Sequence, residues 1–210
     1  MSNKQKDERL THELYWEELR QKEPADVCQR TEATFSTDRK GYILPFLNQK
    51  YMVLPQEQKI ILLEGNSDQE IELRDYFYLI VLLYLLHAQE VEPTRIWISE
   101  KELKGGVTFF RGPHALRVEE LKEAFGHDPD GFLQAGKKLG GVELFFGDKA
   151  FALPVFPKVP LAYVLWKGDE EFPPQITVMF DSTIEKHFSL DGIWCLVAEV
   201  SQRLLETKQK

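Results

Sequence analysis

The sequence predicts an α+β fold, in which one or more antiparallel sheets carry helices packed on one face. Two β-hairpin signals indicate the sheets: in residues 41–55 and again in residues 142–153, a short polar turn separates two apolar runs. Segments with a helical spacing of apolar side chains lie before and after each hairpin. The chain has 210 residues, and 43% of them are hydrophobic, so a single domain over residues 1–210 can bury a complete core.

In the first half, helices are expected to flank a β-rich stretch. Residues 6–22 form an amphipathic pattern, and Pro24 is expected to end that helix. The hairpin at 41–55 should close through Asn48 and Gln49. The remaining expected elements are a strand at 59–63, a loop at 65–68 and a long apolar helix at 73–87.

In the second half, shorter elements are expected. Ser99 and Glu102 have the spacing of a capping box, which predicts that a short helix begins there. Asp128 and Pro129 are typical of the cap and the first residue of a helix. The other expected elements are a strand at 94–98, helices at 116–125 and 129–139, the hairpin at 142–153, strands at 160–166 and 175–180, and a helix at 190–205.

The two hairpins suggest an internal repeat. Residues 41–55 align without a gap on residues 140–154, with five identities in fifteen positions. The order helix, four strands, helix would then occur twice, as pseudo-repeats at 6–90 and 115–206. A saddle with the element order of TATA-box-binding-protein-like folds would satisfy this order, without implying a function. The alternative is that two unrelated hairpins share their turn chemistry.

Charge and cysteine content exclude several classes. There are 26 Lys and Arg against 34 Asp and Glu, so the net charge of −8 argues against a nucleic-acid partner. The two cysteines, Cys28 and Cys195, cannot build a four-thiolate site, and no histidine has metal-ligand spacing, so no metal is expected. The apolar run at 76–86 is too short for a span of about 20 residues. With a polar N-terminus, this predicts no membrane partner and a cytoplasmic location.

A first candidate site lies in the acidic turn that follows Trp166. Asp169, Glu170 and Glu171 stand at the end of a strand, and Asp181 follows the return strand. The three consecutive carboxylates could act as a general base or bind Mg²⁺. If the strands pair, however, Asp181 lies about 20 Å from them, since a strand rises about 3.3 Å per residue. The alternative is a solvated acidic turn, with Asp181 or its neighbour capping a short helix.

A second candidate site is the loop that contains Phe109, Phe110, Arg111 and His114. Arginine can bind an anion through two parallel hydrogen bonds, and histidine can donate, accept or ligate. Together with Trp166, these side chains are expected to line a partly apolar cleft for an organic cofactor, a corrinoid or another tetrapyrrole being one choice. The alternative is an ordinary loop that its two phenylalanines anchor to the core.

Several segments resemble a known family. The run VPLAYVLWKGDEEFPPQITVMFD, with the earlier segments WISEKELKGG and FGHDPDGFLQAGKKLGG, is similar to the prokaryotic domain-of-unknown-function family three-seven-eight-six. The resemblance covers residues 28–205, and its most specific part is WKGDEEFPP followed by FD. It implies a prokaryotic protein near anaerobic redox or one-carbon metabolism. Some members carry an added iron–sulfur domain, for which two cysteines are too few, and no catalytic residue is implied.

Three hypotheses for the function follow. The first is a ligand-binding or accessory protein, because no nucleophile–base pair is visible. The second is a protein-interaction module or a homodimer, and the third is a carboxylate or Mg²⁺-dependent enzyme centred on residues 169–171. Catalytic residues and cofactor are unassigned. The candidate ligand-binding residues are Phe110, Arg111, His114, Trp166, Asp169, Glu170, Glu171 and Asp181.

Overall fold

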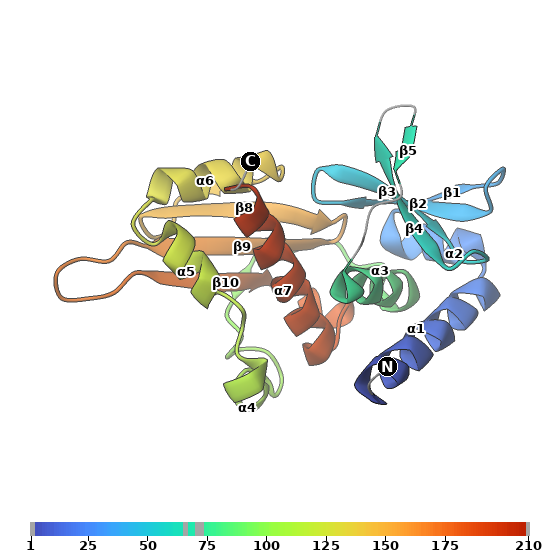
Figure 1. Cartoon of the computed structure of the whole chain (residues 1–210), viewed down its shortest axis with the longest axis horizontal. Helices are drawn as coiled ribbons and strands as arrows, with labels where there is room; N and C mark the ends of the chain where they lie inside the picture. Colours follow the sequence, from blue (N-terminus) through green and yellow to red (C-terminus); the bar gives the residue numbers. More distant parts are fainter. Residues whose placement is uncertain (1–2, 65–66, 70–73, 209–210) are drawn as a thin grey trace.

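Two five-stranded antiparallel sheets with helices packed against them confirm the predicted α+β class (Figure 1). The computed structural model describes residues 3–64, 67–69 and 74–208. The first sheet has the strand order β1-β2-β3-β4-β5, and the second has the order β6-β10-β9-β8-β7. Helices α3 and α7 lie at the centre, between the two sheets (Figure 1).

The first half matches most of the expected elements. It consists of α1 (Asn3–Gln21), α2 (Pro24–Thr31), β1 (Thr34–Ser36), β2 (Gly41–Phe46), β3 (Gln49–Leu54), β4 (Lys59–Glu64), β5 (Ser67–Gln69) and α3 (Asp75–His87). The loop prediction at 65–68 is wrong for Ser67 and Asp68, which pair with β4; residues 65–66 lie outside the described residues. The sequence analysis missed α2, because Pro24 opens this helix as well as following α1.

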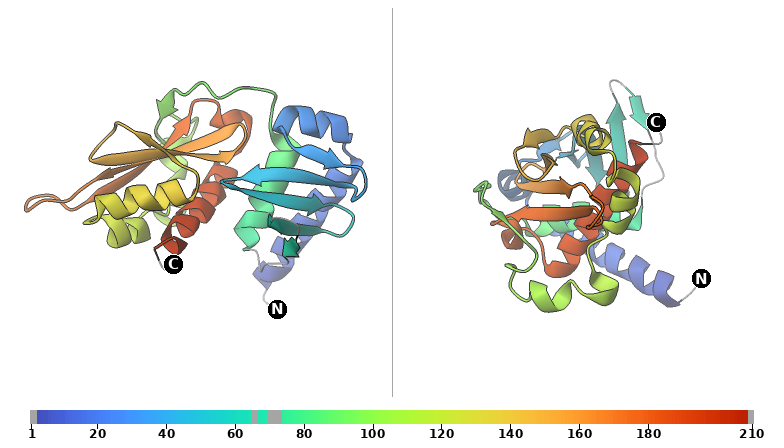
Figure 2. Two further views of the ribbon diagram at one scale, coloured as in Figure 1. Left: turned by 90° about the horizontal axis from the view of Figure 1, so that it is seen from above. Right: turned by 90° about the vertical axis from the view of Figure 1, so that its left-hand side faces the viewer.

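The second half begins with a segment that crosses over one side of the molecule (Figure 2). Its elements are β6 (Trp97–Ile98), α4 (Gly106–Phe109), α5 (Glu119–Phe125), α6 (Pro129–Lys138), β7 (Val142–Leu144), β8 (Lys149–Phe156), β9 (Val159–Trp166), β10 (Gln175–Asp181) and α7 (Leu190–Glu206), with 3₁₀ turns at Gly112–His114 and Ile184–Lys186. Asp128 caps α6 as expected. Glu102 does accept hydrogen bonds from the backbone and hydroxyl of Ser99, but these close a turn, and the helix expected there is wrong.

One continuous hydrophobic core joins the two halves. Tyr84 of α3 stacks on Phe156 of β8, with ring centroids 4.4 Å apart. Phe156 also contacts Phe46 of β2 edge to face at 5.2 Å, and Phe46 contacts Phe77 of α3 at 4.9 Å. Each such ring stabilises the fold by about 1.5–3 kcal/mol through burial. The halves are therefore held together by their largest side chains.

The element order supports a different repeat register from the expected one. When β5 is set aside, the order α1-α2-β1-β2-β3-β4-α3 recurs as α5-α6-β7-β8-β9-β10-α7, which places β2 and β3 over β8 and β9. Both of these hairpins close through a two-residue turn, with Phe46 opposite Gln49 and Phe156 opposite Val159. Both first strands also contain a Leu-Pro pair, at 44–45 and 153–154. The alignment of 41–55 with 140–154 instead places β2 over β7, one strand out of step. The duplication itself stays a prediction.

A buried histidine lies beside α3. His187 is 1% exposed, and neither ring nitrogen has a hydrogen-bond partner in the described part of the chain. Burial, reinforced by the positive charge of Lys158, lowers the pKa of His187 to about 4. The ring is therefore neutral at pH 7 in the folded protein, whereas an unfolded histidine titrates near pH 6.5.

This difference predicts a loss of stability in acid. Between pH 6.5 and pH 4 the unfolded chain binds a proton at His187 that the folded chain does not bind, so the free energy of unfolding falls as the pH falls. The expected loss at pH 4 is about 3 kcal/mol, since each pKa unit corresponds to about 1.4 kcal/mol. Urea denaturation at several pH values should show this slope in the wild type and a shallower one in His187→Phe. The same slope in both proteins would contradict the assignment; the exposed His127→Asn variant is the control.

Candidate functional site

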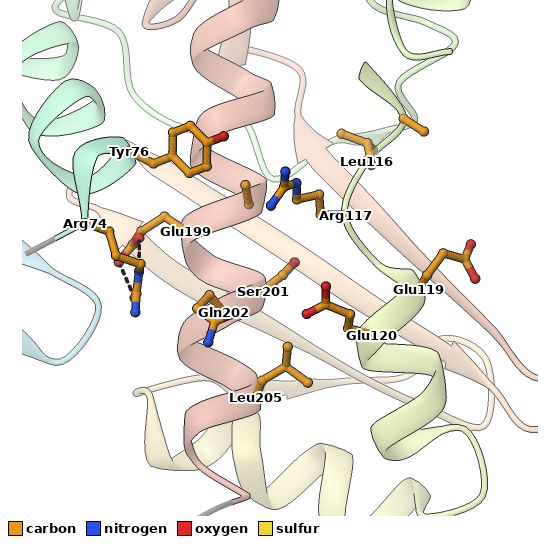
Figure 3. Close-up of a pocket in the computed structure, with 12 residues that line it drawn as sticks. Arg74, Tyr76, Leu116, Arg117, Glu119, Glu120, Glu199, Ser201, Gln202 and Leu205 are labelled. Atoms are coloured by element: carbon orange, nitrogen blue, oxygen red, sulfur yellow. Dashed lines mark hydrogen bonds and ion pairs between the residues drawn. The ribbon is translucent and has the colours of Figure 1, made fainter. Parts of the chain in front are cut away.

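A hollow of about 320 Å³ lies between the start of α3, the segment that leads into α5, and one face of α7 (Figure 3). Its volume falls within the range of small-molecule sites, which begins at about 300 Å³. Leu116 and Leu205 supply apolar wall, and Ser201 and Gln202 supply polar groups. Because three segments far apart in the sequence build it, the hollow exists only in the folded chain.

A row of aromatic rings leads along α7 to this hollow. His114 stacks on Phe109 at 4.7 Å and meets Trp194 of α7 edge to face at 6.1 Å. Trp194 in turn meets Tyr76 of α3 at 5.5 Å. The indole Nε1 of Trp194 donates a hydrogen bond to the carbonyl of Ala115, at 3.1 Å, which fixes the segment before α5 on α7.

Arg117 provides a positive charge at the end of this row. Its guanidinium carbon lies 5.2 Å from the ring centre of Trp194 and 5.9 Å from that of Tyr76. These distances are within the range of cation–π contacts. Among the described residues, no carboxylate forms an ion pair with Arg117. The two rings therefore orient a cation whose charge is not neutralised by a bonded carboxylate.

Glu120 provides a negative charge on the same side. In Figure 3 its carboxylate and the guanidinium of Arg117 both point toward α7, while Glu119 points away. Glu119 is paired with Lys122 at 2.6 Å, whereas no ion pair is described for Glu120. Among the described residues that line the hollow, Arg117 and Glu120 thus supply one charge of each sign without an ion pair.

The wall beside α3 is a buried ion-pair network. The carboxylate of Glu199 is fully buried and accepts hydrogen bonds from Nε and Nη2 of Arg74, at 2.8 and 2.7 Å, and from Nε of Arg203 at 2.7 Å. Arg74 also binds Glu206 at 2.5 Å. Hydrogen bonding to Glu199 raises the pKa of Arg74 further above its ordinary value. The network joins the start of α3 to α7 and gives the buried carboxylate of Glu199 hydrogen-bond donors in place of solvent.

None of the predicted residues lines the hollow; His114 is connected to it only through Trp194, whose ring meets that of Tyr76. Arg111 is exposed on the same segment, and among the described residues its side chain has no ion pair. Phe110 packs against the core and lines a separate hollow of about 200 Å³ with Leu116 and β10. The predicted loop thus contributes Phe110 to the smaller hollow, and its side chains do not share one cleft with Trp166.

Trp166 and the acidic turn lie elsewhere, at the far end of the second sheet. Trp166 is the last residue of β9 and is 53% exposed. Asp169 accepts hydrogen bonds from the backbone of Glu171 and Phe172, which lower its pKa, and Glu170 is exposed. No hydrogen bond or ion pair described for the chain joins this turn to the loop at 109–114.

Asp181 is a structural carboxylate. It is 1% exposed and accepts hydrogen bonds from the backbone of Thr94, Arg95 and Thr183, at 3.1, 2.6 and 3.0 Å. Burial raises the pKa of Asp181, but the hydrogen bonds from Thr183, Thr94 and Arg95 outweigh this effect and lower it overall. Asp181 therefore attaches the segment before β6 to the end of β10.

Sequence reasoning missed the residues that surround the hollow. Tyr76 belongs to the apolar run of α3, Trp194 to the apolar face of α7, and Arg117 stands alone in an unremarkable loop. One signal was present: Glu199 is a charged residue on an otherwise apolar stretch of α7, which indicates a buried partner.

Two further findings concern metal ions and membranes. In the described residues, no group of three or more His, Cys, Asp or Glu side chains is arranged so that it could hold a metal ion. None of the helices in the described ranges is both long and apolar enough to cross a membrane.

The ion-pair network predicts the effect of one substitution. Glu199→Gln keeps the shape but removes the charge, so the free energy of unfolding should fall by about 2–3 kcal/mol, the contribution of hydrogen bonds to charged groups. Chemical denaturation measures this loss. The matched control, Glu206→Gln, changes a half-exposed partner of Arg74 and should cost less than about 1 kcal/mol. Equal losses in the two variants would contradict the central role of Glu199.

Comparison with known proteins places the chain in a family. No curated protein and no solved structure matches it. One protein-family model, described as a domain of unknown function (DUF3786), matches residues 23–203 and thus spans α2 to most of α7, with every residue that lines the hollow except Leu205. The resemblance of the WKGDEEFPP region and its neighbours is confirmed by this match, and the chain belongs to the DUF3786 family.

Proposed function

We propose that this chain is a ligand-binding protein, and that the hollow between α3, α5 and α7 binds a small zwitterion of the amino-acid class. The observation that carries the proposal is Arg117, an exposed cation oriented by two aromatic rings and without an ion pair in the described chain. An arginine so placed can bind a carboxylate through two parallel hydrogen bonds.

The negative charge of Glu120 favours a zwitterionic ligand over a simple anion. A simple anion would meet the unpaired carboxylate of Glu120 and be repelled by it. A ligand with an ammonium group as well as a carboxylate satisfies both Arg117 and Glu120. Leu116 and Leu205 offer apolar contacts to its side chain, while Gln202 can donate or accept one further hydrogen bond.

The size of the hollow favours a compact ligand. At about 320 Å³ it lies at the lower end of the range for small-molecule sites, which extends to about 1,000 Å³. A corrinoid or another tetrapyrrole therefore receives less support than an amino acid. An accessory role in anaerobic redox or one-carbon metabolism of a prokaryotic cytoplasm remains part of the proposal, supported by the family resemblance. The net charge of −8 supports the absence of a nucleic-acid partner.

Thermal denaturation with three sets of compounds tests the proposal. The sets are amino acids, the corresponding 2-oxo acids without the ammonium group, and the corresponding amines without the carboxylate. At a concentration 100 times its dissociation constant, a ligand adds about 2.7 kcal/mol, or about 5–10 °C in Tm for a domain of this size. We expect this shift from at least one amino acid and a smaller shift from its two analogues.

Variants then assign the effect to the hollow. Arg117→Ala should abolish the shift, measured relative to the unliganded variant. Glu120→Gln should reduce the preference for the amino acid over the 2-oxo acid. Arg111→Ala removes an exposed arginine of the same segment outside the hollow and should keep the full shift. No response to any amino acid, or the same response in Arg117→Ala and Arg111→Ala, would overturn the proposed function.

A further inference from the structure

A second functional surface lies at the far end of the second sheet, away from the hollow. Two loops meet there: residues 145–148, between β7 and β8, and residues 167–174, between β9 and β10. Figure 1 shows the second loop projecting beyond the end of the sheet. We call these two loops, together with Trp166, the tip.

The tip exposes large aromatic side chains. Phe145 is 99% exposed, Phe172 is 68% exposed and Trp166 is 53% exposed, while Phe146 is 43% exposed. Single exposed apolar residues are ordinary, but four exposed aromatic residues on two adjacent loops and the end of β9 form the kind of patch that marks an interaction surface. Aromatic residues are also the ones that contribute most to binding in protein interfaces.

Hydrogen bonds hold the two loops in a defined arrangement. The carboxylate of Asp148 accepts from the backbone N–H of Lys167 at 2.9 Å, and the N–H of Asp148 donates to the carbonyl of Leu165 at 2.9 Å. Within the second loop, Asp169 accepts from the backbone N–H of Phe172 at 2.7 Å and donates its own N–H to the carbonyl of Phe172 at 2.9 Å. A patch ordered before binding loses little conformational entropy on binding.

The negative charge of the tip favours a positively charged partner. Its two loops contain four carboxylates, Asp148, Asp169, Glu170 and Glu171, against one cation, Lys167. We propose that the tip docks a segment of a partner protein in which lysine or arginine side chains alternate with apolar ones. The apolar side chains of that segment contact the four rings, and its cations pair with the exposed carboxylates or lie over the rings.

The same charges disfavour the other occupants. Two copies of this chain that met tip to tip would bring like charges together, and the whole chain carries a net charge of −8. A membrane with anionic lipids and a nucleic acid would repel the tip for the same reason. A basic, partly apolar protein segment fits both the rings and the carboxylates.

Fluorescence anisotropy with two labelled peptides tests the inference. One peptide repeats the unit Leu-Lys-Lys-Leu and the other repeats Leu-Glu-Glu-Leu. The basic peptide should bind the full chain and the acidic one should not. The double variant Phe145→Ser/Phe172→Ser keeps every charge of the tip, and it should weaken binding of the basic peptide about tenfold or more, as expected for aromatic side chains at the centre of an interface.

Controls separate the tip from general attraction to an acidic protein. Leu14→Ser/Val107→Ser changes two exposed apolar residues elsewhere and should leave the affinity unchanged. Glu170→Gln/Glu171→Gln should weaken binding and reduce its dependence on salt. Three results would overturn the proposal: no binding of the basic peptide, equal binding by the two serine double variants, or a dimer in sedimentation velocity that the tip variant abolishes.

Discussion

The structure depends on one carboxylate, that of Glu199, which is removed from solvent and held between two arginines. Its partner Arg74 stands at the start of α3, and its partner Arg203 lies one turn further along α7. Arg203 also lies over the ring of Phe77, at 5.2 Å, so the network is continuous with the aromatic core beneath it. An unpaired carboxylate at this depth would be costly, and the two central helices can therefore pack in few other ways. The arrangement of α3 and α7 in turn sets the shape of the hollow, which residues of both helices line.

The elements that the sequence predicts correctly are those held by interactions between residues close in sequence. The hairpins at β2–β3 and β9–β10 and the cap at Asp128 depend on residues close in sequence, and the sequence predicts all three. The turn of the first hairpin, expected at Asn48 and Gln49, lies one residue earlier, because Gln49 already pairs with Phe46 as the first residue of β3. α2 was missed because a proline that can end one helix can also begin the next. The alignment of 41–55 with 140–154 rests on five scattered identities, which are too few to fix the strands that correspond, and the duplication stays a prediction.

The hollow could not be predicted from the sequence, because residues far apart in the chain form it. Arg74 and Glu199 are 125 positions apart, and neither has a neighbour in sequence that indicates the other. The sequence indicates His114 as a candidate binding residue. In the structure, its ring packs between those of Phe109 and Trp194, contacts that the sequence does not indicate. Conversely, the sequence indicates Asp169 and Asp181 as candidate site residues, whereas in the structure their carboxylates stabilise a turn and the end of a strand.

The strands at the borders of both sheets have a further consequence. The first sheet ends in β1 and β5, with three residues each, and the second ends in β6 and β7, with two and three residues. Such short borders expose few unpaired backbone N–H and C=O groups, so another chain finds little template on which to add a strand. Short border strands disfavour edge-to-edge aggregation, and they favour recognition through side chains over recognition through extension of a sheet.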